Sequence, residues 1–113
     1  QYARGSWWER IFGWRFLDPV EVAGRIAAST PDGVTLVALS HLGLRADREL
    51  ARRVPRLDIV LGGHSHDTLM QPEYVGDVPI VHAGPYGTYV SRSRLTRDGA
   101  RTRIADFALE RLA

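Results

Sequence analysis

The sequence predicts an α/β fold in which a parallel βαβ half is followed by antiparallel hairpins. Two short apolar runs, VTLVAL at residues 34–39 and LDIVL at residues 57–61, are typical of buried strands. A segment with helical spacing precedes each run, which predicts parallel neighbours joined by a crossover. Beyond residue 67 the pattern changes to alternating polar and apolar residues around tight turns. At 113 residues the chain has room for one core.

Two helices are predicted from their boundary residues. Asp18 can cap a helix and Pro19 fits its first position, and the helix ends before the turn TPDG at residues 30–33. A second helix is expected over residues 46–54, and Pro55 ends it. Each helix therefore leads directly into one of the two apolar runs.

The second half of the chain predicts hairpins. Residues 74–81 form one around the turn Gly76-Asp77, and residues 84–87 (GPYG) form a compact loop. Residues 89–95 and 101–109 form another hairpin, around Asp98-Gly99.

The first 17 residues are rich in aromatic side chains. Ser6 and Glu9 have capping-box spacing, and Gly13 can end a short helix after them. We interpret the segment as a loop whose rings pack on the sheet or on a neighbour; an interfacial membrane anchor is the alternative.

Charge and composition exclude several classes of function. The net charge is +2 with scattered basic residues, so nucleic-acid binding is not indicated. There is no cysteine, hence no disulfide or thiolate metal site. No run of 18 apolar residues predicts a transmembrane segment. The chain starts at Gln1 without a signal-peptide pattern, and we expect it to be a piece of something longer.

Histidines stand where both predicted parallel strands end. His41 follows the first strand, and His64 and His66 follow the second after the pair Gly62-Gly63, which lets the backbone turn and approach a ligand closely. Open α/β sheets place ligands at this edge, and imidazole is a common metal ligand. The sequence therefore predicts a metal site built from the three histidines.

The carboxylates needed to complete such a site are badly placed. Asp58 begins its strand at the far end, and Asp67 is better suited to orienting a histidine than to binding the metal itself. His82 lies among apolar residues and is interpreted as structural or surface-facing. Both a mononuclear zinc site and an incomplete two-metal site stay open.

Several motifs together resemble a known family. They are FLDP at residues 16–19, VALSHLG at 37–43, DRELA at 47–51, DIVLGGHSH at 58–66 and PIVHAGPYG at 79–87. In this order they resemble the calcineurin-like metallophosphoesterases, within them the group of 5′-nucleotidases, UDP-sugar hydrolases and 2′,3′-cyclic phosphodiesterases.

The resemblance implies a four-layer α/β/β/α sandwich with two divalent metal ions (Mn, Zn, Fe, Co or Ca) that hydrolyses phosphoesters such as nucleotides. His41 and His64 would then bind one ion and His66 the other, and a metal-activated hydroxide would attack phosphorus. A periplasmic or extracellular location is implied as well.

Part of the family pattern is missing from these residues. The family's Asp-x-His, bridging Asp and Gly-Asn-His motifs do not occur, nor does the separate nucleotide-binding domain. We therefore expect residues 1–113 to be the C-terminal part of one metallophosphoesterase domain, inactive without the N-terminal half. One alternative is a dimanganese thiosulfohydrolase of sulfur oxidation, against which Leu42 counts. Another is a non-catalytic module that binds a metal or a partner through Trp7, Trp8 and Trp14.

Overall fold

The structure, a computed structural model, describes residues 4–99 and 101–112. The helices are α1 (Trp7–Phe12), α2 (Pro19–Ser29) and α3 (Leu44–Arg53). The strands are β1 (Val37–Leu39), β2 (Ile59–Gly62), β3 (Glu73–Val75), β4 (Val78–His82), β5 (Tyr89–Asp98) and β6 (Arg101–Arg111). The range 1–113 predicted for the domain includes residues 1–3, 100 and 113, which lie outside the described residues.

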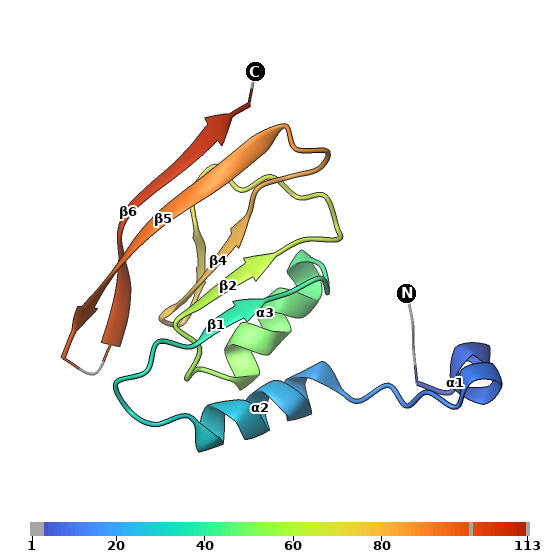
Figure 1. Cartoon of the computed structure of the whole chain (residues 1–113). Helices are drawn as coiled ribbons and strands as arrows, with labels where there is room; N and C mark the ends of the chain where they lie inside the picture. Colours follow the sequence, from blue (N-terminus) through green and yellow to red (C-terminus); the bar gives the residue numbers. More distant parts are fainter. Residues whose placement is uncertain (1–3, 100, 113) are drawn as a thin grey trace.

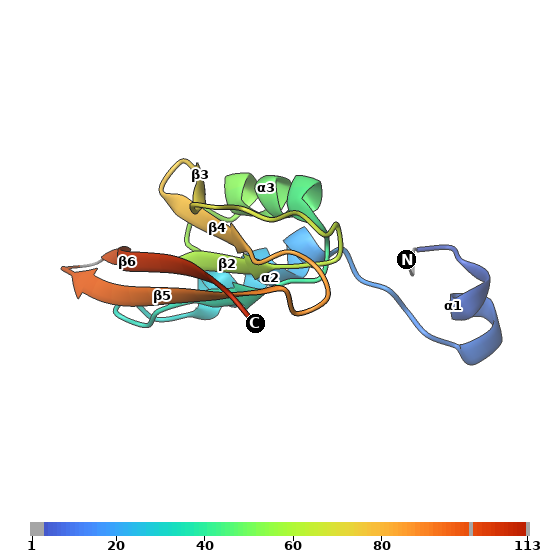
Figure 2. The same ribbon diagram turned by 90° about the horizontal axis from the view of Figure 1, so that it is seen from above.

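The strands form a four-stranded sheet and a separate long hairpin. The sheet has the order β1-β2-β4-β3, in which β1, β2 and β4 are parallel and β3 is antiparallel to β4. Strands β5 and β6 pair only with each other in this structure. Figure 1 shows α3 beside this sheet, and Figure 2 shows the sheet between α3 and the hairpin. The mixed α/β fold predicted from the sequence is confirmed.

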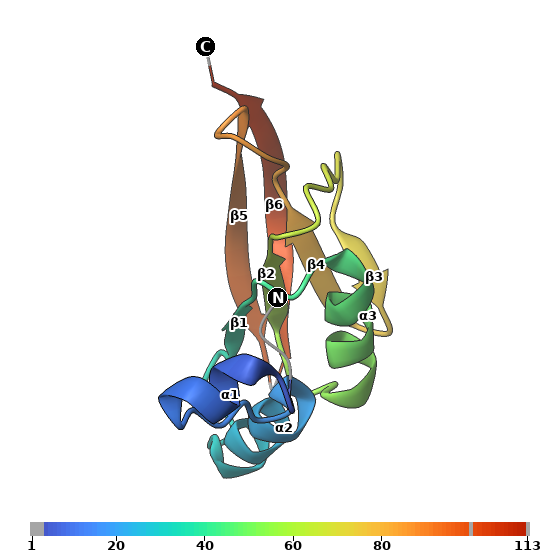
Figure 3. The ribbon, with the colours of Figure 1, turned by 90° about the vertical axis from the view of Figure 1, so that its right-hand side faces the viewer.

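The core lies between the sheet and the helices. Leu50 and Ala51 of α3 pack against Val60 of β2 and Ile80 of β4, and all four side chains are buried. The opposite face of the sheet is turned toward the β5–β6 hairpin, as the side view in Figure 3 shows. The parallel strands β2 and β4 are largely buried, which explains their nearly continuous apolar sequences, whereas β1 at the edge of the sheet exposes Val37 and Leu39.

The predicted start of α2 is confirmed in detail. The Asp18 carboxylate accepts the backbone N–H groups of Val20 and Glu21 at 2.9 and 3.0 Å, and Pro19 occupies the first helical position. The helix α3 begins at Leu44, two residues before the expected start at Ala46, because the left-handed backbone of Gly43 (φ 92°) ends the preceding turn directly.

Two strand predictions need correction. The first apolar run becomes strand only over β1, three of its six residues, because residues 34–36 lead in from the turn after α2. The hairpin predicted at residues 74–81 is confirmed as β3 and β4, which pair antiparallel. The unexpected feature is that β4 also joins the parallel sheet, where Val60 pairs with Ile80 and Gly62 with His82. The alternation of polar and apolar residues along a strand does not show whether each neighbouring strand is parallel or antiparallel to it.

The N-terminal segment forms α1 and a cluster of stacked aromatic rings. The Ser6 side chain makes no capping bond; Glu9 instead accepts the N–H groups of Phe16 and Gly5 at 2.8 and 2.7 Å, and these bonds lower the pKa of Glu9. Trp7 and Trp8 stack with centroids 4.3 Å apart. Figures 1 and 2 show the backbone of this segment away from the sheet, and packing of its rings on a neighbour stays a prediction. Within the described residues no helix is both long and apolar enough to cross a membrane.

Candidate metal centre

The ends of β1 and β2 bring two histidines together. These strands are parallel neighbours, with Leu39 opposite Leu61, and the backbone N–H of Ser40 extends their pairing to the Leu61 carbonyl at 2.8 Å. His41 follows immediately, and His64 stands two residues beyond the end of β2. The crossover inferred from the sequence thus places both side chains at the carboxyl edge of the sheet.

His41 and His64 have the spacing of two ligands of one ion. His41 Nε2 and His64 Nδ1 are 3.3 Å apart, and the ring centroids are 4.9 Å apart. Two nitrogens each about 2.0–2.1 Å from a tetrahedral zinc ion would be roughly 3.3 Å apart. Both side chains are exposed. The two nitrogens are within hydrogen-bond distance of each other, and their separation equals that of two ligands of one tetrahedral ion.

His66 lies in the same turn but has a different neighbour. Its ring meets the ring of Tyr86 edge-on, with centroids 5.1 Å apart. Across residues 4–99 and 101–112, no three His, Cys, Asp or Glu side chains gather into a group that could hold a metal ion. The close pair is therefore His41 with His64, and the role of His66 stays a prediction.

The turn holding His64 and His66 has unusual backbone angles. Both residues have positive φ, 80° and 63°, in a region that costs residues with a side chain free energy. The two glycines before them, Gly62 and Gly63, do not. The left-handed positions of the turn are thus occupied by the histidines and not by the glycines, and the close approach of the glycines to a ligand stays a prediction.

Ser65 ties this turn to the start of α3. Its hydroxyl accepts the backbone N–H of Leu44 at 2.9 Å, which satisfies a helix N-terminal donor that Gly43 has no side chain to cap. The same hydroxyl donates to Asp67. The bond that the structure gives Asp67 is thus to Ser65, and its predicted action on a histidine stays a prediction.

A buried polar cluster lies beneath the histidines. The Asp47 carboxylate is fully buried; one oxygen accepts the Ser40 hydroxyl, and the other is 2.7 Å from His82 Nε2. Ser40 also accepts the backbone N–H of Leu42 at 3.1 Å. His82, predicted to be structural or surface-facing, is 1% exposed and therefore lies in the interior.

Sequence reasoning missed this cluster. Asp47 was assigned to the second helix without a role, and it is separated from His82 by 35 residues. The available signal was that Asp47 lies three residues before Leu50 and so shares the apolar face of α3.

Known proteins match the chain in both sequence and structure. The uncharacterized metallophosphoesterase YunD of Bacillus subtilis is 32% identical over 93 residues, which are 81% of this chain and 20% of that protein. A 5′-nucleotidase of Diplobatis ommata is 28% identical over 81 residues, covering 56% of this chain and 14% of the relative. The solved structure of sulfate thiohydrolase SoxB from Thermus thermophilus matches with a TM-score of 0.64 and 30% identity, over 85% of this chain and 18% of that one.

These matches confirm the resemblance of the chain to the calcineurin-like metallophosphoesterases that its motifs indicate. No family model matches the chain. The chain spans a fifth or less of the length of these three proteins.

The carboxylate of Asp58 lies at the start of β2, at the opposite end from the histidines. Asp58 Oδ2 accepts the backbone N–H of Leu36 at 2.7 Å and lies 3.2 Å from Arg56 Nη1. Burial raises the pKa of Asp58, but the hydrogen bonds from Leu36, Thr102 and Arg56 outweigh it, so the pKa lies below its usual value. Asp58 therefore holds the segment before β1 to the segment before β2.

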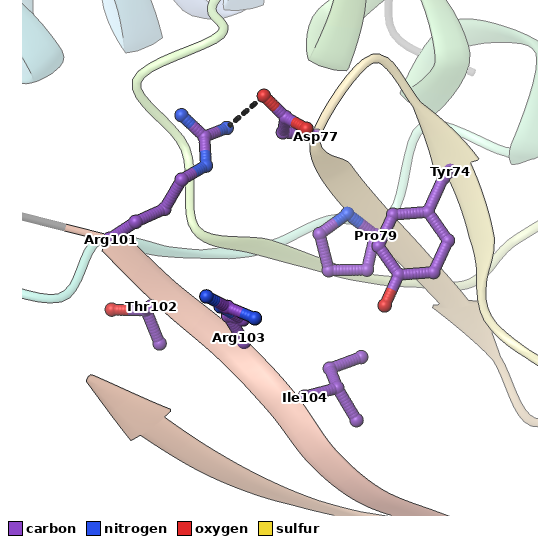
Figure 4. Close-up of a pocket in the computed structure, with 7 residues that line it drawn as sticks. All are labelled: Tyr74, Asp77, Pro79, Arg101, Thr102, Arg103 and Ile104. Carbon is purple, nitrogen blue, oxygen red and sulfur yellow. Dashed lines mark ion pairs between the residues drawn. The ribbon is translucent and has the colours of Figure 1, made fainter. Parts of the chain in front are cut away.

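A hollow of about 400 Å³ lies between the β3–β4 turn and β6. Figure 4 shows Tyr74, Pro79 and Ile104 lining it, with Asp77 and Arg101 forming an ion pair at 3.2 Å. It lies at the beginning of β4, whereas His82 ends that strand. None of the four histidines lines this hollow.

Proposed function

We propose that the protein to which this chain contributes hydrolyses phosphoesters of nucleotides at a centre of divalent metal ions. The observation that carries the proposal is the 3.3 Å separation of His41 Nε2 and His64 Nδ1 at the carboxyl edge of a parallel sheet. The relatives named metallophosphoesterase and 5′-nucleotidase support the reaction class.

The residues of this chain would hold one side of the centre. His41 and His64 would bind one ion together, and His66 would face a second, with Tyr86 beside its ring. Divalent ions at such a centre lower the pKa of a bound water and neutralise charge on the phosphoryl group. Tyr86 is 88% exposed, and its ring would stack on a substrate base. Asp67 and Ser65 keep the turn fixed to α3 while substrate binds.

These residues are an incomplete donor set. Two imidazoles and a third nearby leave most positions around two ions without a protein ligand, since the Asp-x-His and Gly-Asn-His motifs do not occur in this sequence. We infer that residues 1–113 form the C-terminal part of a metallophosphoesterase domain and that they alone have no appreciable activity. A periplasmic or extracellular location is part of the same proposal.

Zinc binding by the 113-residue chain tests the centre. Calorimetric titration of the parent should give weak saturable binding, which His41→Ala and His64→Ala each remove. His82→Gln is the matched control, because it removes a buried imidazole while keeping an N–H donor for Asp47. Equal Zn²⁺ binding by the parent and the two alanine variants would refute the shared ion.

A phosphatase assay on a longer protein tests the reaction. The gene containing these residues should encode Asp-x-His and Gly-Asn-His upstream, and its full product should hydrolyse a nucleoside monophosphate when Mn²⁺ is supplied. The product with His64→Ala should lose that activity. An upstream sequence without these motifs would contradict the proposal.

One alternative function has an observation in its favour. The match to sulfate thiohydrolase SoxB, at 30% identity and a TM-score of 0.64, supports a thiosulfohydrolase of sulfur oxidation as the alternative. Leu42 counts against this reading, because such enzymes tend to have asparagine after the histidine of the first motif. Assaying both substrate classes with the same full product separates the two reactions.

A further inference from the structure

A buried ionisable pair lies directly below the candidate metal centre, and the proposed reaction does not use it. Asp47 is 0% exposed and His82 is 1% exposed, and their side chains are 2.7 Å apart. Burying such groups costs several kcal/mol unless each is well paired. The pair therefore needs a role that compensates for this cost.

The pair connects the ends of three strands. Asp47 lies near the start of α3 and accepts a hydrogen bond from the hydroxyl of Ser40, the residue between β1 and His41. His82 is the last residue of β4 and pairs in register with Gly62, the last residue of β2. The ends of β1 and β2, which lead to His41 and His64, thus both lie next to the Asp47–His82 pair.

Gly62 shows how tightly the end of β2 lies on this pair. A Cβ atom at this position would be 2.1 Å from Asp47 Oδ2 and 2.1 Å from His82 Nε2. The φ of Gly62 is not in the left-handed region, so close approach alone requires glycine here. The position of the β2 end, and of His64 two residues later, is therefore set by where Asp47 and His82 stand.

We propose that Asp47 and His82 are positioning residues that set the separation of His41 from His64 for joint metal binding. Asp47 fixes the Ser40–His41 turn through the Ser40 hydroxyl. His82 fixes the Asp47 carboxylate by donating to its second oxygen, and both side chains support the end of β2. This inference rests on the proposed function, because it takes His41 and His64 as ligands. Neither Asp47 nor His82 is itself a ligand, since both are buried beneath Gly62.

The test compares two substitutions of His82 that differ in one hydrogen bond. His82→Gln keeps an N–H donor for Asp47, whereas His82→Leu leaves the buried carboxylate oxygen without one. Both remove the imidazole. Leu50→Ala, in the same helix and core, is the control for general loss of stability. Ser40→Ala is a milder variant that removes only the hydroxyl bond to Asp47.

Two readouts are measured on the 113-residue chain, at a temperature where urea titration shows each variant folded. The first is the Zn²⁺ dissociation constant. We expect it to rise about tenfold or more for His82→Leu and severalfold for Ser40→Ala, the range typical for residues that orient metal ligands. It should stay within about threefold of the parent value for His82→Gln and Leu50→Ala.

The second readout needs no metal. The ring–ring nuclear Overhauser contact between His41 and His64 should be present in the parent, His82→Gln and Leu50→Ala, and weakened in His82→Leu and Ser40→Ala. A contact unchanged in His82→Leu and Ser40→Ala overturns the proposal, as does an equal rise of the Zn²⁺ dissociation constant in Leu50→Ala. If the parent shows the ring contact but binds no Zn²⁺, the metal function fails, and the contact alone then decides the positioning role.

Discussion

Substituting Gly62 by alanine should be among the most damaging single-methyl changes in this chain. The added Cβ would stand 2.1 Å from both Asp47 Oδ2 and His82 Nε2, and 2.7 Å from His82 Cδ2. These atoms belong to side chains that are 0% and 1% exposed, so neither can move toward solvent without opening the core. The methyl must therefore break the Asp47–His82 hydrogen bond or displace the end of β2.

The expected loss in the free energy of unfolding is the sum of two contributions. Overpacking of a close-packed interior costs about 1–3 kcal/mol. Losing a buried hydrogen bond to a charged group costs about 1.5–3 kcal/mol. We therefore expect Gly62→Ala to lower the free energy of unfolding by about 2.5–6 kcal/mol, a large part of the roughly 5–15 kcal/mol of a small domain.

The neighbouring glycine provides a matched control. A Cβ on Gly63 would meet His41 Nδ1 at 3.6 Å and the Ser40 carbonyl at 3.9 Å, which are ordinary contacts. Gly63→Ala should change the free energy of unfolding by no more than about 1 kcal/mol. Urea unfolding followed by circular dichroism measures both variants. A loss below about 1 kcal/mol for Gly62→Ala, or equal losses for the two, would refute the tight packing inferred here.

Three further substitutions test other parts of the structure. His64→Gly should change the free energy of unfolding by no more than about 1 kcal/mol, because relief of the positive φ offsets the added entropy of the unfolded state. Calorimetry should find that this variant no longer binds Zn²⁺, and retained binding would contradict the ligand role of His64. The pKa of Asp58 is lower in the folded state, so its contribution to stability is present above its unfolded pKa of about 3.9 and is lost as the pH falls below that value. In urea titrations from pH 6 to pH 2.5, the free energy of unfolding should therefore fall less steeply with pH for Asp58→Asn than for the parent. The same pH dependence in both proteins would contradict this prediction. Glu73→Gln removes the exposed 2.7 Å ion pair with Arg48 and should cost less than about 1 kcal/mol, so a larger loss in urea unfolding would show that this pair holds α3 to β3.

Local signals in the sequence predicted much of the fold. The start of α2 follows from Asp18 and Pro19, since capping and proline geometry act within a few residues. The β5–β6 hairpin follows from Asp98-Gly99 and the alternation around it. The carboxyl-edge position of the histidines follows from the helix–strand order.

Features that depend on distant residues could not be predicted in the same way. The membership of β4 in the parallel sheet depends on pairing with β2, which its own alternation does not encode. Gly62 was interpreted as a turn residue. Glycine is required at this position because Asp47 and His82, which are distant in the sequence, approach it in the folded chain. Within the site, the order of the strands predicted that His41 and His64 lie together. The contact of His66 with Tyr86 could not be predicted, because local sequence signals do not determine the path of the loop that carries Tyr86.

A crystal structure of the chain soaked with Zn²⁺, with anomalous data collected at the zinc edge, tests the shared ion most directly. The account predicts one anomalous peak about 2.0–2.1 Å from both His41 Nε2 and His64 Nδ1. A peak bound to only one of these nitrogens, or zinc found only elsewhere on the chain, would contradict it.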